Sequence, residues 1–383
     1  MRVVVYEENC ENFYPLINLY PQFNLRIGMK TIAENIHYYF PKAKVDYIAR
    51  DIFEFKKIRT NEPTVYLSSR FIMTGKFTVA NDEANLLVGQ IVVGFVKHKP
   101  PFPKTFTEIE HVKGGIKKIQ RISGLVINNL WDLINYNEPM LLNHFKARRG
   151  KGESHEKIYI IGSKKNLFVA EGARIHNLVT IDVTEGPVYI DKGAVIQPFS
   201  TIIGPSYIGT NTVINRAKIT KSSIGPMCRI GGEVEACIFQ GYANKYHEGF
   251  IGHSFIGEWV NLGALTTNSD LKNNYSPVRI KIGERELDSG MIKLGCFIGD
   301  HTKTGIGTLI PTGAVIGSFV NFFEGGMIPR YVPCFKWLTS KKLDDYDLEN
   351  ALRTAKAVMK RRNVKMSKQY ENVIRLSYKC RNL

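Results

Sequence analysis

The densest group of reactive side chains in the sequence lies in residues 242–272. Its central member is His247, because an ordinary imidazole titrates near neutral pH and can take a proton from an attacking amine. Two cations and two amides lie close to it in sequence and offer contacts to a phosphate, to hydroxyl groups or to a carbonyl: Lys245, Lys272, Asn261 and Asn268. A lone histidine is more often a surface or capping residue, so the prediction of a site rests on the whole group.

A repeat of six residues defines the elements that must position this group. Aliphatic residues recur at every sixth position, as in Ile190, Ile196, Ile202, Ile208 and Ile214, and again in Ile292, Ile298, Ile310 and Ile316. A period of six fits neither the helical turn nor strand alternation and is typical of a parallel β-helix, in which three hexads complete one triangular coil. We expect hexads from about residue 169 to 320, interrupted at 240–249 and 268–291. Such interruptions usually form loops on the binding face.

The rest of the chain suggests two further parts. Residues 1–150 alternate strand and helix patterns and predict an α/β domain, with strands at Val3–Tyr6, Lys44–Ile48, Thr64–Leu67 and Leu86–Val93 and a helix at Gly28–Tyr39. Residues 148–152 read as a linker to a β-helix domain at 151–338. Residues 339–383 predict a basic helical tail, with a helix from Leu343 capped by Asp344 or Asp345.

The composition of the chain limits the classes of binding partner that we expect. The net charge is +17, which fits nucleic acid or anionic small substrates such as phosphates and coenzyme A. About seven of these charges belong to the tail after Ser340, where no basic-aromatic nucleic-acid motif appears, so we expect no nucleic-acid partner. The six cysteines show no metal-binding spacing, and no signal peptide or membrane-length apolar run is present. We therefore expect a cytoplasmic protein with reduced thiols.

The segment from Gly241 to Lys272 resembles a known enzyme family. The pattern His247-x-x-Phe250-Ile-Gly, followed by Asn261-Leu-Gly-Ala-x-Thr, is similar to the acetyltransferase segment of bifunctional N-acetylglucosamine-1-phosphate uridylyltransferase/glucosamine-1-phosphate N-acetyltransferases. The match is closer to a variant bacterial and archaeal branch with a degenerate nucleotidyltransferase domain. The resemblance implies a left-handed parallel β-helix that forms homotrimers. It also implies acetyl-CoA as co-substrate, an amino-sugar phosphate of the glucosamine-1-phosphate type as acceptor, and a place in UDP-sugar biosynthesis.

The resemblance also implies roles for single residues. His247 is the general base. The substrate-binding candidates are Asn244, Lys245, Phe250, Asn261, Asn268, Asp270, Lys272 and Glu235. The acetyl-CoA candidates are Gly263, Ala264, Gly299 and Lys303. Two positions depart from the better-known branch, because Phe250 replaces a tyrosine and Glu235 replaces a lysine that would attract phosphate.

The N-terminal part resembles the nucleotidyltransferase half of the same branch. Arg26, Gly28 and Arg70 are its nucleotide-binding candidates, and Asp132 is a candidate Mg²⁺ ligand. The glycine-rich phosphate loop of such domains is absent, because Glu7-Glu8-Asn9 follows the first strand. Transfer from UTP, with Mg²⁺, is thus an open alternative to a domain that only packs against the rest.

Two other functions remain alternatives at this point. Some hexapeptide β-helices are hydratases with a metal held by histidines, and His247, His253 and His301 are available. The second alternative is a scaffold or regulatory protein that binds sugar nucleotides without turnover. A metal assay and an acetyl-CoA turnover assay separate these alternatives from the acetyltransferase.

Overall fold

A computed structural model describes residues 1–55, 62–146 and 158–380. They form two compact units. The N-terminal unit comprises residues 1–13, 20–25 and 30–132, and the solenoid unit comprises residues 14–19, 26–29 and 133–383. The predicted linker at 148–152 lies outside the described residues.

The N-terminal unit is built on a six-stranded mixed sheet in the order β4-β1-β5-β8-β7-β9. Its strands are β1 (Arg2–Tyr6), β4 (Lys44–Ile48), β5 (Thr64–Ser68), β7 (Ala84–Val88), β8 (Ile91–Lys97) and β9 (Ile119–Arg121). The central strand β1 pairs in parallel with β4 and β5, and all of its residues are buried. The predicted single strand at Leu86–Val93 is wrong. A turn at Gly89 and Gln90 divides it into the antiparallel strands β7 and β8.

Short elements complete this unit. Helix α1 (Ile32–Tyr39) begins four residues later than predicted, because Thr31 caps it in a reciprocal capping box with Glu34. The other elements are α2 (Phe106–Gly115), η1 (Cys10–Asn12), η2 (Gln22–Asn24), β3 (Lys30–Thr31), β6 (Phe71–Ile72) and β10 (Leu125–Val126).

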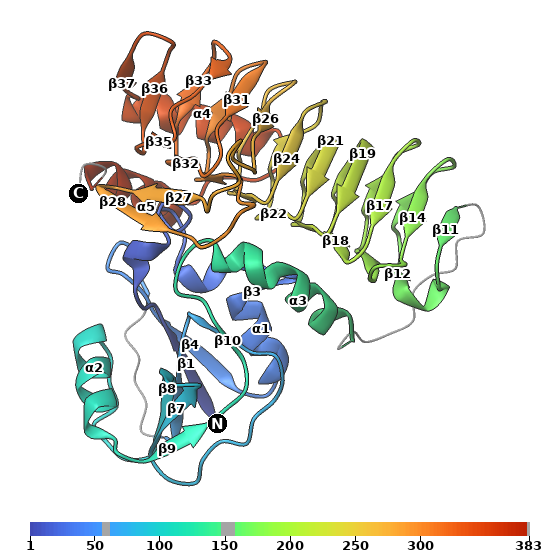
Figure 1. Ribbon diagram of the computed structural model, residues 1–383. Helices are drawn as coiled ribbons and strands as arrows, with labels where there is room; N and C mark the ends of the chain where they lie inside the picture. Colours follow the sequence, from blue (N-terminus) through green and yellow to red (C-terminus); the bar gives the residue numbers. More distant parts are fainter. Residues whose placement is uncertain (56–61, 147–157, 381–383) are drawn as a thin grey trace. The chain divides into compact units, whose positions relative to one another are not determined.

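The solenoid unit is the predicted parallel β-helix, with three rows of short strands that repeat along the chain (Figure 1). Row A is one nine-stranded parallel sheet: β12 (Leu167–Val169), β15 (Val188–Ile190), β18 (Ser206–Ile208), β20 (Ser223–Ile224), β22 (Ile238–Phe239), β25 (Phe255–Ile256), β29 (Phe297–Ile298), β32 (Val315–Ile316) and β35 (Tyr331–Val332). The repeating isoleucines of the hexads, such as Ile190, Ile208 and Ile230, are fully buried and stack in the core. The hexapeptide prediction is confirmed, except that Ile292, which was counted in the repeat, is 51 % exposed and lies outside this core.

Rows B and C share two long strands, β19 (Val213–Thr220) and β21 (Arg229–Glu235), that turn the corner between them. Row B also contains β13 (Arg174–Ile175), β16 (Val195–Ile196), β23 (Asn244–Lys245), β30 (Lys303–Thr304), β33 (Asn321–Phe322) and β36 (Lys336–Leu338). Row C also contains β11 (Tyr159–Ile161), β14 (Thr180–Asp182), β17 (Thr201–Ile203), β24 (Phe250–Gly252), β26 (Thr267–Asn268), β31 (Thr308–Ile310) and β34 (Gly326–Met327).

The two predicted interruptions differ in kind. Residues 240–249 are not an insertion throughout, because Asn244 and Lys245 form β23 in register with β21, and the extra residues follow it. The second interruption is a real insertion that carries an antiparallel hairpin, β27 (Arg279–Ile282) and β28 (Arg285–Asp288).

A ladder of stacked rings marks the corner between rows A and B. Tyr242, Trp259, His301, Phe319 and Phe335 stack from coil to coil, with centroid separations of 4.1 Å for the first pair and 4.7 Å and 4.8 Å for the last two. All five residues have positive φ, so each presents its ring at the same point of its coil. This ladder fixes the register of the coils in the middle of the solenoid.

The remaining helices also belong to the solenoid unit, apart from the first residue of α3. They are α3 (Asp132–Lys146), α4 (Leu348–Lys360) and α5 (Lys368–Lys379). The predicted helix start at Leu343 is wrong, since Leu343–Asp345 is strand β37, antiparallel to β36, and the cap of α4 is Asp347. None of the helices in the described ranges is long and apolar enough to span a membrane.

Candidate functional site

His247 lies in the loop between β23 and β24, at the corner where row B passes into row C. Its side chain is exposed. Lys245 binds this loop to the preceding coil. Its Nζ donates to the backbone carbonyl of Gly231 at 2.7 Å and to that of His247 at 2.9 Å. Lys245 is 2 % exposed, and this burial lowers its pKa to about 8. Lys245 therefore anchors the backbone that carries the candidate base.

Row B brings three of the predicted residues into one line across successive coils. Asn244 pairs with Asn261, and Asn261 pairs with Lys303, through parallel bridges. The side-chain Nδ2 of Asn244 donates to Oδ1 of Asn261 at 2.9 Å. Lys303 Nζ donates to the carbonyl of His301 at 2.9 Å, and burial lowers the pKa of Lys303 to about 8. The two amides thus form a polar line beside the His247 loop.

Row C brings three others together at its far end. Glu235, the last residue of β21, is in register with Gly252, and a Cβ on Gly252 would lie 2.4 Å from the ring of Phe250 and 2.7 Å from Oδ2 of Asp270. The predicted substrate contacts therefore fall into two groups. One follows row B and the other ends row C, with strand β24 and the His247 corner between them.

Sequence reasoning missed one short side-chain contact of this region. His253 Nδ1 lies 2.7 Å from Asp270 Oδ2, and both side chains are mostly buried. Burial alone would raise the pKa of Asp270, but the hydrogen bond and charge of His253 outweigh it and lower that pKa. The available signal was a spacing of 17 residues, which is one coil here: Asn244 and Asn261, and Phe250 and Thr267, are also 17 apart and in contact.

Several predicted residues have structural contacts. Asn268 is 4 % exposed, donates to the carbonyls of Gly252 and Ser269, and accepts from the N–H of Gly252 at 2.7 Å. Lys272 Nζ donates to the carbonyl of Pro277 at 2.6 Å, within its own insertion.

The predicted acetyl-CoA contacts at Gly263, Ala264 and Gly299 also lie at tight corners. A Cβ on Gly263 would come within 2.5 Å of the backbone of Gly305, and one on Gly299 within 2.6 Å of Ser318. The carbonyl of Ala264 accepts from the N–H of Gly307. These glycines allow successive coils to approach closely.

The histidine-metal alternative gains no support from the geometry. His301 is 1 % exposed, stacks inside the aromatic ladder, and its Nε2 lies 3.0 Å from the hydroxyl of Tyr370. Burial lowers the pKa of His301 well below its usual value. Among residues 1–55, 62–146 and 158–380, no three His, Cys, Asp or Glu side chains gather where they could hold a metal ion.

In the N-terminal unit, Arg70, a candidate phosphate-binding residue, forms an ion pair with the carboxylate of Glu8. Glu8 Oε2 accepts from Arg70 at 2.7 Å, and Glu8 Oε1 accepts from Lys113 at 2.7 Å. Burial opposes ionisation of Glu8, but the charges of Arg70 and Lys113 prevail and lower the pKa of Glu8. Arg70 also donates to Asn128 at 2.7 Å. Its positive charge is therefore neutralised within the protein.

The other nucleotide-binding candidates lie elsewhere. Arg26 belongs to the solenoid unit, where its side chain donates to the carbonyls of Gln240 and Met29. Gly28 has a φ of 62°, and a Cβ there would meet His144 at 2.7 Å, so it permits close packing on α3. Asp132 accepts from the N–H groups of Asn128 and Asn129, and burial raises its pKa despite these bonds.

Comparison with known proteins bears on both units. Residues 3–151 match the family described as sugar nucleotidyl transferase. The chain is 32 % identical over 210 residues to the bifunctional sugar-1-phosphate nucleotidylyltransferase/acetyltransferase of Sulfurisphaera tokodaii, covering 54 % of this chain and 46 % of that protein. The resemblance read from the motifs is confirmed.

Two archaeal proteins named bifunctional protein GlmU are also similar. The one from Methanocaldococcus jannaschii is 28 % identical, covering 52 % of this chain and 45 % of that protein. The one from Methanococcus maripaludis strain C5 is 27 % identical, covering 66 % of this chain and 55 % of that protein. The chain thus spans about half the length of the curated relatives it matches. The similarity to GlmU-type proteins, together with the β-helix, agrees with the hexapeptide class of acetyltransferases.

Proposed function

We propose that this chain transfers an acetyl group from acetyl-CoA to the amine of an amino-sugar phosphate of the glucosamine-1-phosphate type, with His247 as general base. The observation that carries the proposal is the arrangement of side chains at the corner between rows B and C. An exposed imidazole stands on a loop that Lys245 holds in place, beside the amides of Asn244 and Asn261. The names of the GlmU-type relatives supply the reaction class.

The chemistry needs one proton acceptor and donors for a developing oxyanion. The amine nitrogen bonds to the thioester carbonyl carbon, the C–S bond breaks, and coenzyme A leaves. His247 takes the proton of the amine and returns it to the departing thiolate. Amides such as that of Asn261 orient the acceptor or stabilise the oxyanion. No covalent acyl-enzyme is required, and burial raises the pKa of the Cys228 and Cys296 thiols to about 12, which makes both poor nucleophiles.

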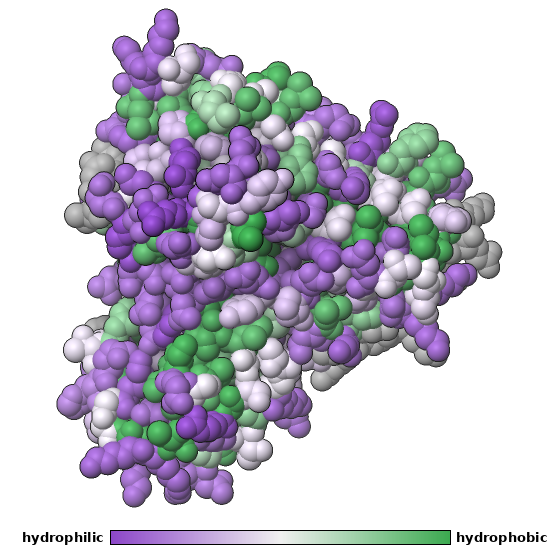
Figure 2. Space-filling model, viewed as in Figure 1, coloured by the Kyte–Doolittle hydropathy of each residue, from purple (hydrophilic) through white to green (hydrophobic). Residues whose placement is uncertain are grey.

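We also propose a homotrimer in which a second copy of the chain lies against the same corner and covers the acetyl-CoA. Exposed apolar side chains follow the row B–row C corner and row C through the later coils: Leu265, Ile306, Leu309, Phe323 and Met327. Figure 2 shows hydrophobic groups at the surface around β31. Ile306 is 71 % exposed and Met327 is 67 % exposed, which is unusual for side chains of this size and typical of an association surface.

Nucleotidyl transfer from UTP with Mg²⁺ is the second candidate, and the family match of residues 3–151 favours it. The Glu8 carboxylate argues against efficient turnover, because it takes the charge of Arg70 that a triphosphate would need. We therefore place acetyl transfer first and treat the N-terminal unit as a nucleotidyltransferase fold with weakened phosphate binding.

A coupled assay with acetyl-CoA and glucosamine 1-phosphate tests the proposal, with free coenzyme A as the readout. His247→Gln should lower kcat at least about a hundredfold, since a general base contributes two to four powers of ten. His176→Gln, at another exposed histidine of the solenoid, should leave kcat unchanged. Equal turnover in both variants would remove His247 as the base, and no turnover in the wild type with any amino-sugar phosphate would favour the scaffold alternative.

A further inference from the structure

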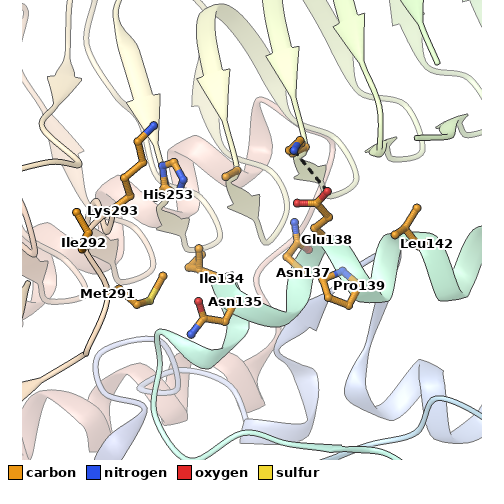
Figure 3. A pocket seen from close by; sticks show the side chains of 12 residues that line it. Ile134, Asn135, Asn137, Glu138, Pro139, Leu142, His253, Met291, Ile292 and Lys293 are labelled. Carbon is orange, nitrogen blue, oxygen red and sulfur yellow. Dashed lines mark ion pairs between the residues drawn. The ribbon is translucent and has the colours of Figure 1, made fainter. Parts of the chain in front are cut away.

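The solenoid unit contains a pocket of about 680 Å³ between the middle of α3, the corner between rows C and A, and residues 291–293 (Figure 3). The charged side chains of this pocket do not converge on one point. Glu138 reaches to Lys221 at 3.5 Å, whereas the ammonium of Lys293 points away from the helix. A set of donors that converges on one anionic group is found instead in the N-terminal unit.

Four hydrogen bonds from three side chains converge there on the carboxylate of Glu8. Its Oε2 accepts from Ser68 Oγ at 2.8 Å. The same oxygen accepts from Arg70 Nε at 2.9 Å and from Arg70 Nη2 at 2.7 Å. Its Oε1 accepts from Lys113 Nζ at 2.7 Å. The three donor side chains therefore surround a single oxyanion, which the protein itself supplies.

This group of donors lies at the switch point of the sheet. In the order β4-β1-β5, the chain passes from β1 to β4 on one side and then to β5 on the other. Tyr6 ends β1 beside Ser68, the last residue of β5, and the N–H of Ser69 donates to the Tyr6 carbonyl at 2.8 Å. Open α/β sheets bind their ligands beyond the carboxyl ends of two such strands. Glu8, two residues after β1, thus occupies the place where this sheet is expected to hold a ligand.

The donors have the properties of an anion site. Among the described residues, Glu8 is the only carboxylate that pairs with Arg70, while Asn128 accepts from the other arm of the guanidinium at 2.7 Å and fixes its orientation. Lys113 pairs with Glu8 and with Glu110. The side chains of Arg70, Glu8 and Lys113 are 9 %, 12 % and 14 % exposed, so this group reaches the surface of the unit. An arginine fork beside a lysine ammonium is a common arrangement for binding phosphate.

We propose that Ser68, Arg70 and Lys113 form a binding site for a phosphoryl group, and that Glu8 closes this site as an internal ligand. One phosphoryl oxygen takes the place of Glu8 Oε2 at Ser68 and Arg70, and a second takes the place of Oε1 at Lys113. The phosphoryl group and Glu8 exclude each other, because both are anions that need the same donors. The contact is therefore autoinhibitory. The proposal concerns binding alone, and it rests neither on acetyl transfer nor on turnover in the N-terminal unit.

The test is calorimetric titration of the full chain with inorganic phosphate and with UTP, at pH 7 and constant ionic strength. Glu8→Ala removes the internal ligand and should bind phosphate at least about tenfold more tightly than the wild type, since a hydrogen bond to a charged group is worth at least that factor. The gain should disappear in Glu8→Ala/Arg70→Gln. Glu110→Ala makes the same change in net charge beside the same lysine and should alter the affinity less than about twofold. A gain with UTP as well assigns the phosphoryl group to a nucleotide, and a gain with phosphate alone assigns it to the free anion.

Acetate distinguishes a phosphoryl site from a space shaped for Glu8 itself. Acetate restores the missing carboxylate with two oxygens and one charge, so Glu8→Ala should bind acetate several-fold more weakly than phosphate. Hydrogen exchange of the β1 amides shows whether the variant is folded, and bound phosphate should increase their protection.

Four results would overturn the proposal. They are an equal gain in Glu110→Ala, a gain that persists without Arg70, tighter binding of acetate than of phosphate, and a loss of β1 protection in Glu8→Ala that phosphate does not restore.

Discussion

The ammonium of Lys245 donates to the backbone carbonyl of His247 at 2.9 Å, and to the carbonyl of Gly231, one coil earlier, at 2.7 Å. A single buried lysine therefore joins the loop of the candidate base to the preceding coil. Lysine suits this task because its flexible stem crosses the coil and its head offers three donors. The burial that makes the contact effective also lowers the pKa of Lys245 to about 8.

Replacing this lysine should affect activity without removing the base. In Lys245→Met, the His247 loop loses its anchor, so we expect kcat for acetyl transfer to fall about tenfold or more through poorer positioning. Gly232→Ala should do the same by a different route, because its Cβ would lie 2.8 Å from Lys245 Nζ at a φ of 68°. Unchanged kinetics in both variants would show that the loop needs no anchor.

The depressed pKa of Lys245 also predicts a pH dependence of stability. Above about pH 8 the folded protein has lost a proton that the unfolded chain keeps up to about pH 10.4, so the Lys245 contribution to unfolding free energy rises with pH in that window. The slope is at most about 1.4 kcal/mol per pH unit for one group. Chemical unfolding of wild type and Lys245→Met at pH 7, 8, 9 and 10 measures it. A constant difference between the two proteins over that range would contradict the buried, perturbed ammonium.

Two asparagines that look alike in the sequence should behave differently. Asn268 bonds both the N–H and the carbonyl of Gly252 in the core, so Asn268→Ala should lower the unfolding free energy by roughly 2–4 kcal/mol by leaving buried backbone groups unpaired. Asn261 is only partly buried and bonds mainly across the surface to Asn244. Asn261→Ala should therefore reduce acetyl transfer with little change in the urea midpoint. A loss of stability in Asn261→Ala, with a loss of activity alone in Asn268→Ala, would contradict these assignments.

The ion pairs of Glu8 predict the behaviour of the N-terminal unit in acid. Because the folded pKa of Glu8 is lowered, its stabilisation is present above its unfolded pKa and is lost as the pH falls through the folded value. Glu8→Gln should cost about 3 kcal/mol at pH 7 by leaving Arg70 and Lys113 unpaired. Hydrogen exchange of the β1 amides measures this cost, which should shrink as the pH falls below about 4. Glu110→Gln, an exposed partner of Lys113, is the control and should cost less than about 0.5 kcal/mol.

Removal of divalent metal should distinguish the two units. Acetyl transfer at the His247 corner uses no metal in the proposed mechanism, so chelation with EDTA should leave its rate unchanged. Release of pyrophosphate from UTP should be slow in the wild type, because Glu8 neutralises Arg70, and should vanish with EDTA. Loss of acetyl transfer on chelation, restored by one metal, would instead revive the histidine-metal alternative.

The β-helix could be predicted because its signal is local and repeated. Each buried isoleucine faces the core at a fixed spacing, and no distant contact is needed to interpret it. The start of α4 was missed because Leu343–Asp345 pairs with β36, a contact that helical periodicity does not reveal. The prediction of a single strand at Leu86–Val93 was wrong because Gly89, with a φ of 59°, reverses the chain inside a mostly apolar run.

In the candidate site, too, local sequence motifs could be recognised, whereas contacts between distant residues could not. The segment around His247 was visible in the residues, but contacts between coils were not. Asp270 was assigned to substrate, whereas its carboxylate binds His253 one coil earlier. Lys245 was assigned to phosphate, whereas its ammonium binds backbone carbonyls. The contact of Asp270 with His253 follows only from a coil length of 17 residues at this point, which the irregular loop after β23 obscures.

The stack of rings from Tyr242 to Phe335 aligns successive coils of the solenoid with one another. A shift of one inner coil would pull its ring off the rings before and after it, so slippage of that coil must break both of these contacts together. Deleting a complete turn, by contrast, removes one rung and lets the rungs on either side meet. Lengthening or shortening of this protein by whole turns is therefore compatible with its architecture.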